Sequence, residues 1–300
     1  MLALTILGSN SALAAYGRNP TAQILQTNEE FILIDCGEGT QMQMARYKIK
    51  KSKISHIFIS HLHGDHYFGL IGLLSSMALL NRSNDLHLFG PPQLIDIIDL
   101  QLKVADSNLP FKLYFHALGE PGVVADLPTL KVSSFKVSHR ISCWGFIFKE
   151  KTIARSLNPE RLKSFEVPSA YFSRLQNGED YINSKGTIVP NSELTVAGPT
   201  AKKYAYCADT KFDESIIESI KDCDLVYHET TYLKDRQDSA ALRFHSTTID
   251  AGTIAVKANV KKLIIGHFSS KYEKLDDFLT ETTSIFENTE LAIEGACFKI

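Results

Sequence analysis

The stretch that decides the fold spans residues 61–66 and reads His61-Leu62-His63-Gly64-Asp65-His66. Because side chains alternate along an extended chain, His61 and His63 point to the same side of the segment. Gly64 permits a sharp turn, after which Asp65 and His66 can face the same cavity. Imidazole nitrogen and carboxylate oxygen suit Zn²⁺ or Mn²⁺, so this hexapeptide offers two ligand pairs and can begin two adjacent metal sites.

The alternative interpretation of this hexapeptide is a polar turn that carries histidines by chance. With ordinary residue usage, chance places the pattern in a chain of 300 residues roughly once in thousands of cases. The pattern therefore favours a metal site, and other parts of the chain must supply the missing ligands.

The composition is that of a globular protein of 300 residues, with 44% hydrophobic and 22% charged residues. This length supports one large α/β domain or two smaller ones. The formal net charge is −2, so a polyanion would have to be held by local basic patches and by metal. The five cysteines are widely spaced and lack a Cys-x-x-Cys pair, which is typical of reduced thiols in a cytosolic protein.

Two apolar stretches resemble targeting or membrane segments. Residues 1–7, followed by small residues at 11–15, mimic a secretory leader, but the run is short and lacks a basic flank, so we expect a first core strand. Residues 67–80 are too few to cross a bilayer and have the length of a buried helix. We therefore expect a soluble, cytoplasmic protein that does not enter the membrane.

Short apolar runs predict strands, and the segments between several of them have helical patterns. The expected strands span residues 2–8, 22–27, 30–36, 56–60, 86–90, 129–138, 143–149, 204–207, 224–228, 263–266 and 291–299. The expected helices span 66–81, 92–105, 214–221, 248–258 and 274–286. Both halves begin with strands and then interleave helices, which predicts an α/β fold, an αββα four-layer sandwich of two mixed β-sheets with outer helices.

Residues 150–197 interrupt this alternation of strands and helices. They contain Pro159, Pro168 and Pro190, nearly balanced charges and only short helical patterns. Because a segment this long and poor in strands lies between two strands, we interpret it as an excursion from the core within a single domain spanning 1–300. It could be a lid, a protruding arm or a dimerisation element.

Four further polar residues each follow an apolar strand, as the hexapeptide does. They are Asp35 after 31–34, His139 after 130–138, Asp209 after 204–207 and His267 after 263–266. Taken singly, each is more often a capping or surface residue. Their shared position predicts that the loops at the strand ends gather them into one site.

The order of these residues resembles the metallo-β-lactamase fold superfamily, and the match extends to the ribonuclease Z family of tRNA 3′-processing endonucleases. The similar stretches are Asp35-Cys36-Gly37-Glu38-Gly39, Val137-Ser138-His139, Cys207-Ala208-Asp209-Thr210, His228-Glu229-Thr230-Thr231, Phe244-His245-Ser246-Thr247 and Gly266-His267-Phe268-Ser269. The hexapeptide indicates only the superfamily, whereas the elements around Glu229 and His245 indicate the ribonuclease Z branch. The chain has Ala208 and Lys271 where the family usually has Gly and Arg.

The resemblance implies a set of ligands for two zinc ions per subunit, with Mn²⁺ as a possible replacement. The first ion would bind His61, His63 and His139, the second Asp65, His66 and His267, and Asp209 would bridge them. The resemblance also implies that Asp35 orients a ligand histidine from outside the ligand sphere.

The resemblance further implies catalytic roles. A hydroxide formed between the metals would attack phosphorus, and Asp65 would orient or deprotonate the water. His245 would protonate the leaving oxygen, and Glu229 would orient His245. The implied activity is that of a zinc-dependent endoribonuclease that removes the 3′ trailer from precursor tRNA and leaves a tRNA 3′-hydroxyl.

The implied partners are precursor tRNA and a second copy of the chain, with no nucleotide cofactor. In such a homodimer, the arm at 150–197 of one subunit would hold tRNA bound to the other. The run at 46–53 has five basic residues in eight and is either a solvated helix end or a phosphate contact.

Two other functions remain compatible with the same ligands. One is a small-molecule hydrolase of the same superfamily, such as a cyclic-nucleotide phosphodiesterase or a thioester hydrolase. The other is a noncatalytic RNA-binding subunit that has kept the fold, which the intact ligand positions disfavour.

Overall fold

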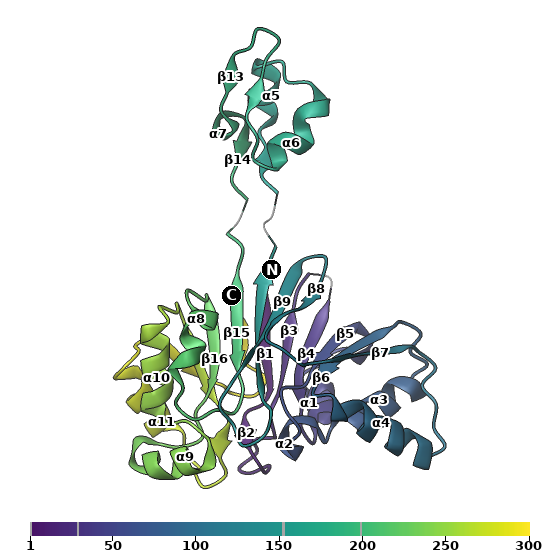
Figure 1. Cartoon of the computed structure of the whole chain (residues 1–300), viewed down its shortest axis with the longest axis vertical. Helices are drawn as coiled ribbons and strands as arrows, with labels where there is room; N and C mark the ends of the chain where they lie inside the picture. The colour runs from purple at the N-terminus through teal and green to yellow at the C-terminus, as the bar shows by residue number, and fades with distance from the viewer. Residues whose placement is uncertain (1, 29, 152–153, 199) are drawn as a thin grey trace. The chain divides into compact units, whose positions relative to one another are not determined.

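The computed structural model describes residues 2–28, 30–151, 154–198 and 200–300. The chain divides into two compact units, which are drawn in Figure 1. The larger unit comprises residues 1–149 and 202–300, and the smaller unit comprises residues 150–201. Among the described residues, no helix combines the length and the apolar character that crossing a bilayer requires.

The larger unit is built on two mixed sheets of seven strands each. The first sheet contains β1 (Ala3–Gly8), β3 (Ala22–Gln26), β4 (Phe31–Cys36), β5 (Ile54–Phe58), β6 (Leu86–Gly90), β7 (Leu113–Ala117) and β20 (Cys297–Lys299). Its strand order is β20-β1-β3-β4-β5-β6-β7, in which β4 to β7 are parallel.

The second sheet contains β8 (Gly122–Asp126), β9 (Leu130–Lys136), β10 (Trp144–Glu150), β15 (Lys203–Cys207), β16 (Leu225–Glu229), β17 (Leu263–Gly266) and β19 (Thr289–Leu291). Its order is β19-β17-β16-β15-β10-β9-β8, with β15, β16, β17 and β19 parallel. A short pair, β2 (Asn10–Ser11) and β18 (Phe268–Ser269), joins the N-terminal loop to the segment after β17.

Alternation along β4 shows how the layers form. Ile32 and Ile34 pack in the core between the sheets, together with residues of the second sheet such as Phe146 and Tyr206. Leu33 points the opposite way and packs with Leu73 and other residues of the helices behind the first sheet. One strand therefore serves two hydrophobic layers, as a sheet inside a sandwich must.

Helices cover the outer face of each sheet (Figure 1). Beside the first sheet lie α1 (Thr40–Arg46), α3 (Leu70–Leu79) and α4 (Gln93–Val104). Beside the second lie α8 (Ile217–Ile220), α10 (Thr248–Lys257) and α11 (Asp276–Thr283). Thr247 and Asp250 form the expected capping box at the start of α10. The prediction of an αββα sandwich is confirmed.

Several predicted boundaries were wrong. The expected helix at 66–81 is divided into α2 (Gly64–Tyr67) and α3, and between them the N–H of Gly69 donates to the carbonyl oxygen of Cys36. A Cβ at Gly69 would lie 2.2 Å from the carbonyl oxygen of Gly37, so the two segments meet too closely for a side chain. The expected strand at 291–299 is two strands of different sheets, β19 and β20, separated by a turn that contains Gly295 at φ +83°.

Several elements were missed in the sequence. They include β7, β8, α1 and α9 (Gln237–Arg243), besides the two-residue strands. The strands β7 and β8 form one edge of each sheet, where most of their residues are only half-buried or exposed. Edge strands of this kind lack the continuous apolar run that revealed the central strands.

The smaller unit has a small core of its own. Its helical segments are α5 (Pro159–Ser164), η2 (Ser169–Tyr171), α6 (Phe172–Gln176) and α7 (Asn191–Leu194). Its strands form two short pairs, β11 (Ser156–Leu157) with β14 (Thr195–Val196) and β12 (Tyr181–Ile182) with β13 (Ile188–Val189). The core residues are Leu162, Val167, Leu175, Tyr181, Val189 and Leu194. Of the predicted insertion, residues 152 and 153 lie outside the described part, and its role as an arm stays a prediction.

Candidate metal centre

The residues expected as ligands meet beside the carboxyl ends of the parallel strands of both sheets. Asp35 lies at the end of β4, the hexapeptide follows β5, and Asp209 and His267 follow β15 and β17. Because neighbouring parallel strands end at the same edge, their loops approach one another there. The shared sequence context of these residues thus corresponds to one place in the fold.

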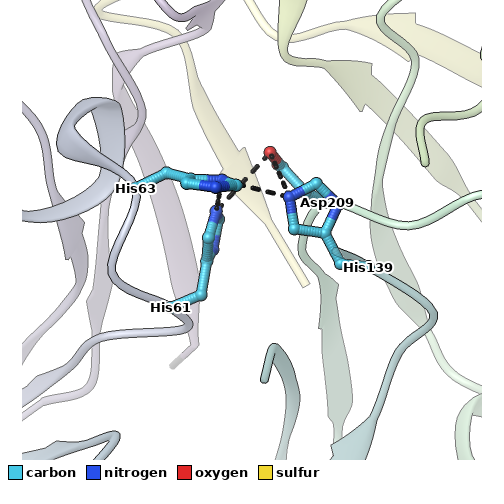
Figure 2. A group of neighbouring side chains, drawn as sticks. All are labelled: His61, His63, His139 and Asp209. Atoms are coloured by element: carbon cyan, nitrogen blue, oxygen red, sulfur yellow. Dashed lines mark hydrogen bonds and ion pairs between the residues drawn. The ribbon is translucent and has the colours of Figure 1, made fainter. Parts of the chain in front are cut away.

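The first group that could hold a metal comprises His61, His63, His139 and Asp209. Figure 2 shows the three rings and the carboxylate pointing toward one another. Nδ1 of His63 lies 3.0 Å from Nε2 of His61 and 3.1 Å from Nε2 of His139. Three imidazoles and one carboxylate form a donor set that Zn²⁺ accepts. We call this the three-histidine group.

The second group comprises Asp65, His66 and His267. Nε2 of His66 lies 3.2 Å from Nε2 of His267 and 3.7 Å from Oδ2 of Asp65. Nε2 of His267 lies 3.3 Å from the same carboxylate oxygen. We call this the two-histidine group.

Asp209 lies between the two groups and presents one oxygen to each. Its Oδ2 is 3.6 Å from Nε2 of His61, whereas its Oδ1 is 3.3 Å from Nε2 of His66 and 3.2 Å from Nε2 of His267. Oδ1 is buried and has no partner with hydrogen-bond geometry among the described residues. A buried carboxylate oxygen without a hydrogen bond raises the free energy of the folded state unless a positive charge compensates it. The donor set therefore fits a pair of cations that Asp209 bridges.

The imidazoles of the three-histidine group are held neutral. Burial lowers the pKa of His61 well below its ordinary value and also lowers the pKa of His139. Burial and the nearby ring of His139 lower the pKa of His63 to about 4. Neutral imidazoles have a free lone pair, which is the form that binds metal.

In the two-histidine group, nearby carboxylates favour a charged imidazole instead of a neutral one. Burial acts against a charge on His66, but Asp209, Asp65 and Asp35 outweigh it and raise its pKa well above the ordinary value. Burial also acts to raise the pKa of Asp209, and the rings of His267 and His66 outweigh it and lower that pKa. The site therefore attracts a positive charge, which can be a proton or a metal ion.

Asp35 binds the outer nitrogen of His66. Its Oδ2 accepts hydrogen bonds from Nδ1 of His66 at 2.7 Å, from Oη of Tyr206 at 2.6 Å and from Oγ of Ser60 at 2.8 Å. Asp35 is fully buried and has a positive φ of +54°. Because Nδ1 of His66 is bound to Asp35, Nε2 faces the metal centre.

Each remaining buried ligand histidine also has its second nitrogen held. Nδ1 of His267 lies 2.9 Å from Oγ1 of Thr231, and Nδ1 of His139 lies 3.0 Å from the carbonyl oxygen of Phe244. Nδ1 of His61 lies 3.0 Å from Oγ of Ser60. Sequence reasoning missed these partners and Tyr206. Two of them could have been found, because Ser60 directly precedes the hexapeptide and Thr231 ends the stretch His228-Glu229-Thr230-Thr231.

Glu229 and His245 form a pair beside the ligands. Nδ1 of His245 lies 2.9 Å from Oε1 of Glu229, which also accepts the backbone N–H of Ser246 at 3.0 Å. Glu229 is fully buried, whereas the side chain of His245 is 15% exposed. Burial acts to lower the pKa of His245, but the carboxylate of Glu229 outweighs it and raises that pKa to about 9. His245 thus holds a proton at neutral pH, and its Nε2 has no hydrogen bond to any described residue.

The ligands open into a pocket of about 430 Å³, which we call the metal pocket. Its walls include His63, Asp65, Asp209, His245 and Phe68. The backbone N–H of Ala12, in the N-terminal loop, donates to Oδ2 of Asp65 at 2.7 Å. The metal centre is therefore reachable by a substrate.

The basic run at 46–53 and three further histidines lie outside this centre. None of the basic residues at 46–53 is among the residues that line the metal pocket. His56, His87 and His116 form a stack of rings across β5, β6 and β7. Among the described residues, none of these three rings belongs to a group that could hold a metal.

Comparison with known proteins relates the whole chain to one enzyme family. Ribonuclease Z of Bacteroides thetaiotaomicron is 40% identical over 299 residues, which cover 99% of this chain and 95% of that protein. Ribonuclease Z of Cytophaga hutchinsonii is 44% identical and covers 99% of this chain and 96% of its own length. The chain belongs to the ribonuclease Z family.

Solved structures agree on the fold. The short form of human tRNase Z has a TM-score of 0.72 at 24% identity, covering 99% of each chain. YhfI of Bacillus subtilis, a metallo-β-lactamase fold protein, has a TM-score of 0.69 at 17% identity, covering 99% of this chain and 98% of its own. The sandwich is thus a metallo-β-lactamase fold.

A family model described as Anti-Pycsar protein Apyc1 matches residues 2–156, just over half of the chain, so the chain also belongs to that family. This span contains the hexapeptide and His139 but ends before Asp209, Glu229 and His267. The ribonuclease Z relatives match both halves of the site and are therefore the more informative comparison.

Proposed function

We propose that this chain is a zinc-dependent endoribonuclease that cuts precursor tRNA at the start of its 3′ trailer. The products are a tRNA with a 3′-hydroxyl and a trailer with a 5′-phosphate. The observation that carries this proposal is the arrangement of two ligand groups around Asp209, with the Glu229–His245 pair beside them. Relatives named ribonuclease Z over the full length of the chain support it.

The donor set favours zinc, with two ions per subunit and Mn²⁺ as a possible replacement. Imidazole nitrogens and carboxylate oxygens are borderline ligands that suit both ions. His61, His63 and His139 would hold one ion, Asp65, His66 and His267 the other, and Asp209 both. When bound, such a pair supplies a water nucleophile at neutral pH and stabilises the charge on the phosphate.

Asp65 serves as the residue that orients the attacking water and accepts its proton. Burial acts to raise its pKa, but the rings of His66 and His267 outweigh it and lower the pKa, so the carboxylate is ionised at neutral pH. The N–H of Ala12 holds Oδ2 of this carboxylate at the edge of the metal pocket. An ionised, positioned carboxylate within reach of substrate is the form that such a base requires.

His245 serves as the general acid that protonates the leaving 3′ oxygen. Its Nδ1 is bound to Glu229, so Nε2 is the atom that can donate. Cations nearby would act to lower the pKa of His245, and the buried carboxylate of Glu229 opposes that loss of the proton. Glu229 is fully buried and does not reach substrate, so it is a positioning residue.

The direct test is to mix the purified chain with a precursor tRNA that carries a 3′ trailer, and to measure zinc on the same sample. We expect a single cut at the trailer and about two zinc ions per chain. A protein that holds zinc and leaves this RNA intact, while it hydrolyses a cyclic nucleotide, would instead be a small-molecule phosphodiesterase. Less than one zinc per chain, with tRNA bound but uncut, would indicate a noncatalytic RNA-binding subunit.

Asp65 provides a sharper test of the mechanism. The variant Asp65→Ala should retain the fold and lose tRNA cleavage, because the variant loses both a ligand and the base. Circular dichroism and a cleavage assay measure the two properties, and near-normal turnover would contradict the assigned role.

We further propose a homodimer in which the smaller unit of one subunit holds tRNA bound to the other. The smaller unit has its own hydrophobic core, which is what an independent RNA-holding element needs. In the larger unit, Leu79, Leu80, Leu100 and Val104 on or beside α3 and α4 are all more than 60% exposed, which suits a surface that a second copy covers. Light scattering should give twice the mass of the chain.

Replacing residues 154–198 by a short Gly/Ser linker tests the role of the smaller unit. We expect hydrolysis of a small phosphodiester to persist, because none of the ligands lies in this unit. The KM for precursor tRNA should rise steeply, and an unchanged KM would contradict the role as an arm.

We also propose a cytoplasmic location. Four cysteines, Cys36, Cys143, Cys207 and Cys223, are buried with free thiols, and Cys297 is exposed with a free thiol. Free thiols suit a reducing compartment. Fractionation of cells that express a tagged chain would test this location.

A further inference from the structure

A second pocket adjoins the metal pocket in the larger unit. Its volume is about 410 Å³, and it shares Ser11, Ala12, Arg140 and His245 with the metal pocket. Its far side is formed by residues that include Arg243 and Lys271. We call it the basic pocket. His245 therefore stands in the wall between a pocket that contains the ligands and a pocket that does not.

The two pockets differ in charge. The metal pocket includes the carboxylates of Glu38, Asp65 and Asp209, whereas no carboxylate lines the basic pocket. The basic pocket has the cationic side chains of Arg140, Arg243 and Lys271. This distribution favours a negatively charged ligand in the basic pocket.

The two arginines of the basic pocket contact neutral groups. Arg243 donates to Oη of Tyr232 at 3.3 Å, and Nη2 of Arg140 lies 3.3 Å from Nε2 of His63. In the described part of the chain, none of the three cations lies within salt-bridge distance of a carboxylate. Three cations around one pocket that lack a counter-charge form a binding site for phosphate.

We propose that the basic pocket binds the phosphate on the 5′ side of the last nucleotide of the tRNA, the nucleotide whose 3′ oxygen leaves. This inference rests on the proposed function. In that reaction a bond forms between the water oxygen and phosphorus, and the bond from phosphorus to the 3′ oxygen breaks. The cleaved phosphate stays on the trailer, and the 3′ oxygen takes the proton of His245.

The position of His245 sets the direction of the strand. Its Nδ1 is bound to Glu229, so the leaving oxygen must approach Nε2, at the wall that the two pockets share. The nucleotide that carries this oxygen then extends into the basic pocket, away from the carboxylates of the metal pocket. Its 5′ phosphate meets the cations, and the trailer lies on the side of the metal pocket.

The test combines a protein variant with a neutral phosphate analogue. One precursor tRNA carries a methylphosphonate on the 5′ side of the last tRNA nucleotide, and a second carries it at the first internal phosphate of the trailer. The first analogue should lower kcat/KM of the wild-type chain about tenfold, because a charge-assisted contact is lost. In Lys271→Gln it should lower kcat/KM by a clearly smaller factor than in the wild type, because one of the cations that contact this phosphate is gone.

The trailer analogue and a matched variant serve as controls. The trailer analogue should lower kcat/KM equally in the wild type and in Lys271→Gln. Lys274 is also exposed and lies close in sequence but does not line the basic pocket, so Lys274→Gln should respond to both analogues like the wild type. Arg243→Gln should repeat the result of Lys271→Gln and provides a second variant if one of them unfolds.

Each outcome decides the assignment. If the first analogue affects the wild type and both variants equally, the basic pocket does not hold that phosphate. If the variants instead reduce the effect of the trailer analogue on kcat/KM, the strand runs in the opposite direction and the proposal is wrong. A wild-type chain that fails to cut the unmodified precursor contradicts the proposed function itself, which is a separate result.

Discussion

The two ligand groups share one carboxylate but differ in charge. Apart from Asp209, the three-histidine group has only imidazoles, whereas the two-histidine group adds the carboxylate of Asp65. Attraction for a divalent cation rises with the negative charge of its ligands, most strongly where water is excluded. The comparison teaches that a pair of adjacent sites built from almost the same residues need not bind metal equally.

The groups also differ in what orients their rings. In the two-histidine group, the side chains of Asp35 and Thr231 hold His66 and His267. In the three-histidine group, the outer nitrogen of His63 faces the guanidinium of Arg140 at 3.3 Å. A cation near a ligand weakens its attraction for metal. We therefore expect a chelator to remove metal from the three-histidine group first.

Replacing the shared carboxylate should have the largest effect, because both groups lose it. In Asp209→Ala we expect zinc to fall below one ion per chain and trailer cleavage to fall on the order of 10³-fold or more. Metal analysis and a cleavage assay measure these losses. Asp209→Asn, which keeps the shape without the charge, should also lose most activity. A fully loaded and active Asp209→Ala chain would contradict the bridging role.

Replacing Asp35 should weaken the two-histidine group more than the three-histidine group, because Asp35 binds His66 directly and reaches His61 only through Ser60. Asn tolerates the positive φ of this position, so Asp35→Asn changes the charge with little backbone strain. Loss of such an outer partner typically weakens metal binding about 10- to 100-fold. A chelator titration should then release the two ions together or in reverse order.

Tyr206→Phe is the matched control for this variant. It removes another donor to Asp35 but leaves the contact between Asp35 and His66. Its order of metal release should match the wild type. If it behaves like Asp35→Asn, the effect belongs to the buried network as a whole and not to the orientation of His66.

The same comparison shows how far sequence reasoning reaches. That the expected ligands come together could be predicted because each follows an apolar strand, and strand ends gather at one edge of the fold. The differences between the groups could not, because they depend on Tyr206, Phe244 and Arg140, which approach the site only after the two sheets pack together. The same holds for the break between α2 and α3, where the N–H of Gly69 donates to the carbonyl oxygen of Cys36, a residue of β4.

Replacing Glu229 should change the pH profile more than the metal content. In the proposed mechanism the protonated form of His245 is the active one, so activity should fall as pH rises through its pKa, which Glu229 raises to about 9. In Glu229→Gln the neutral amide no longer stabilises the imidazolium. We expect the alkaline limb of kcat/KM to move about one to two pH units lower.

The charge-preserving variant Glu229→Asp provides the control. It should keep more of the alkaline limb near the wild-type position than Glu229→Gln does, with thermal unfolding showing that both variants fold. An unchanged profile in Glu229→Gln would mean that His245 is not the acid.

The smallest effect is expected at Thr231, which connects the acid to the two-histidine group. Its hydroxyl donates to Oε2 of Glu229 at 2.8 Å and accepts from Nδ1 of His267 at 2.9 Å. In Thr231→Val the backbone N–H still binds Glu229, so His245 keeps its partner and the alkaline limb should not move. His267 loses its acceptor, so the two-histidine group should bind zinc about three- to tenfold more weakly. Thr231→Ser should restore wild-type binding, and a shifted alkaline limb in Thr231→Val would show that the hydroxyl, and not only Glu229, holds the proton on His245.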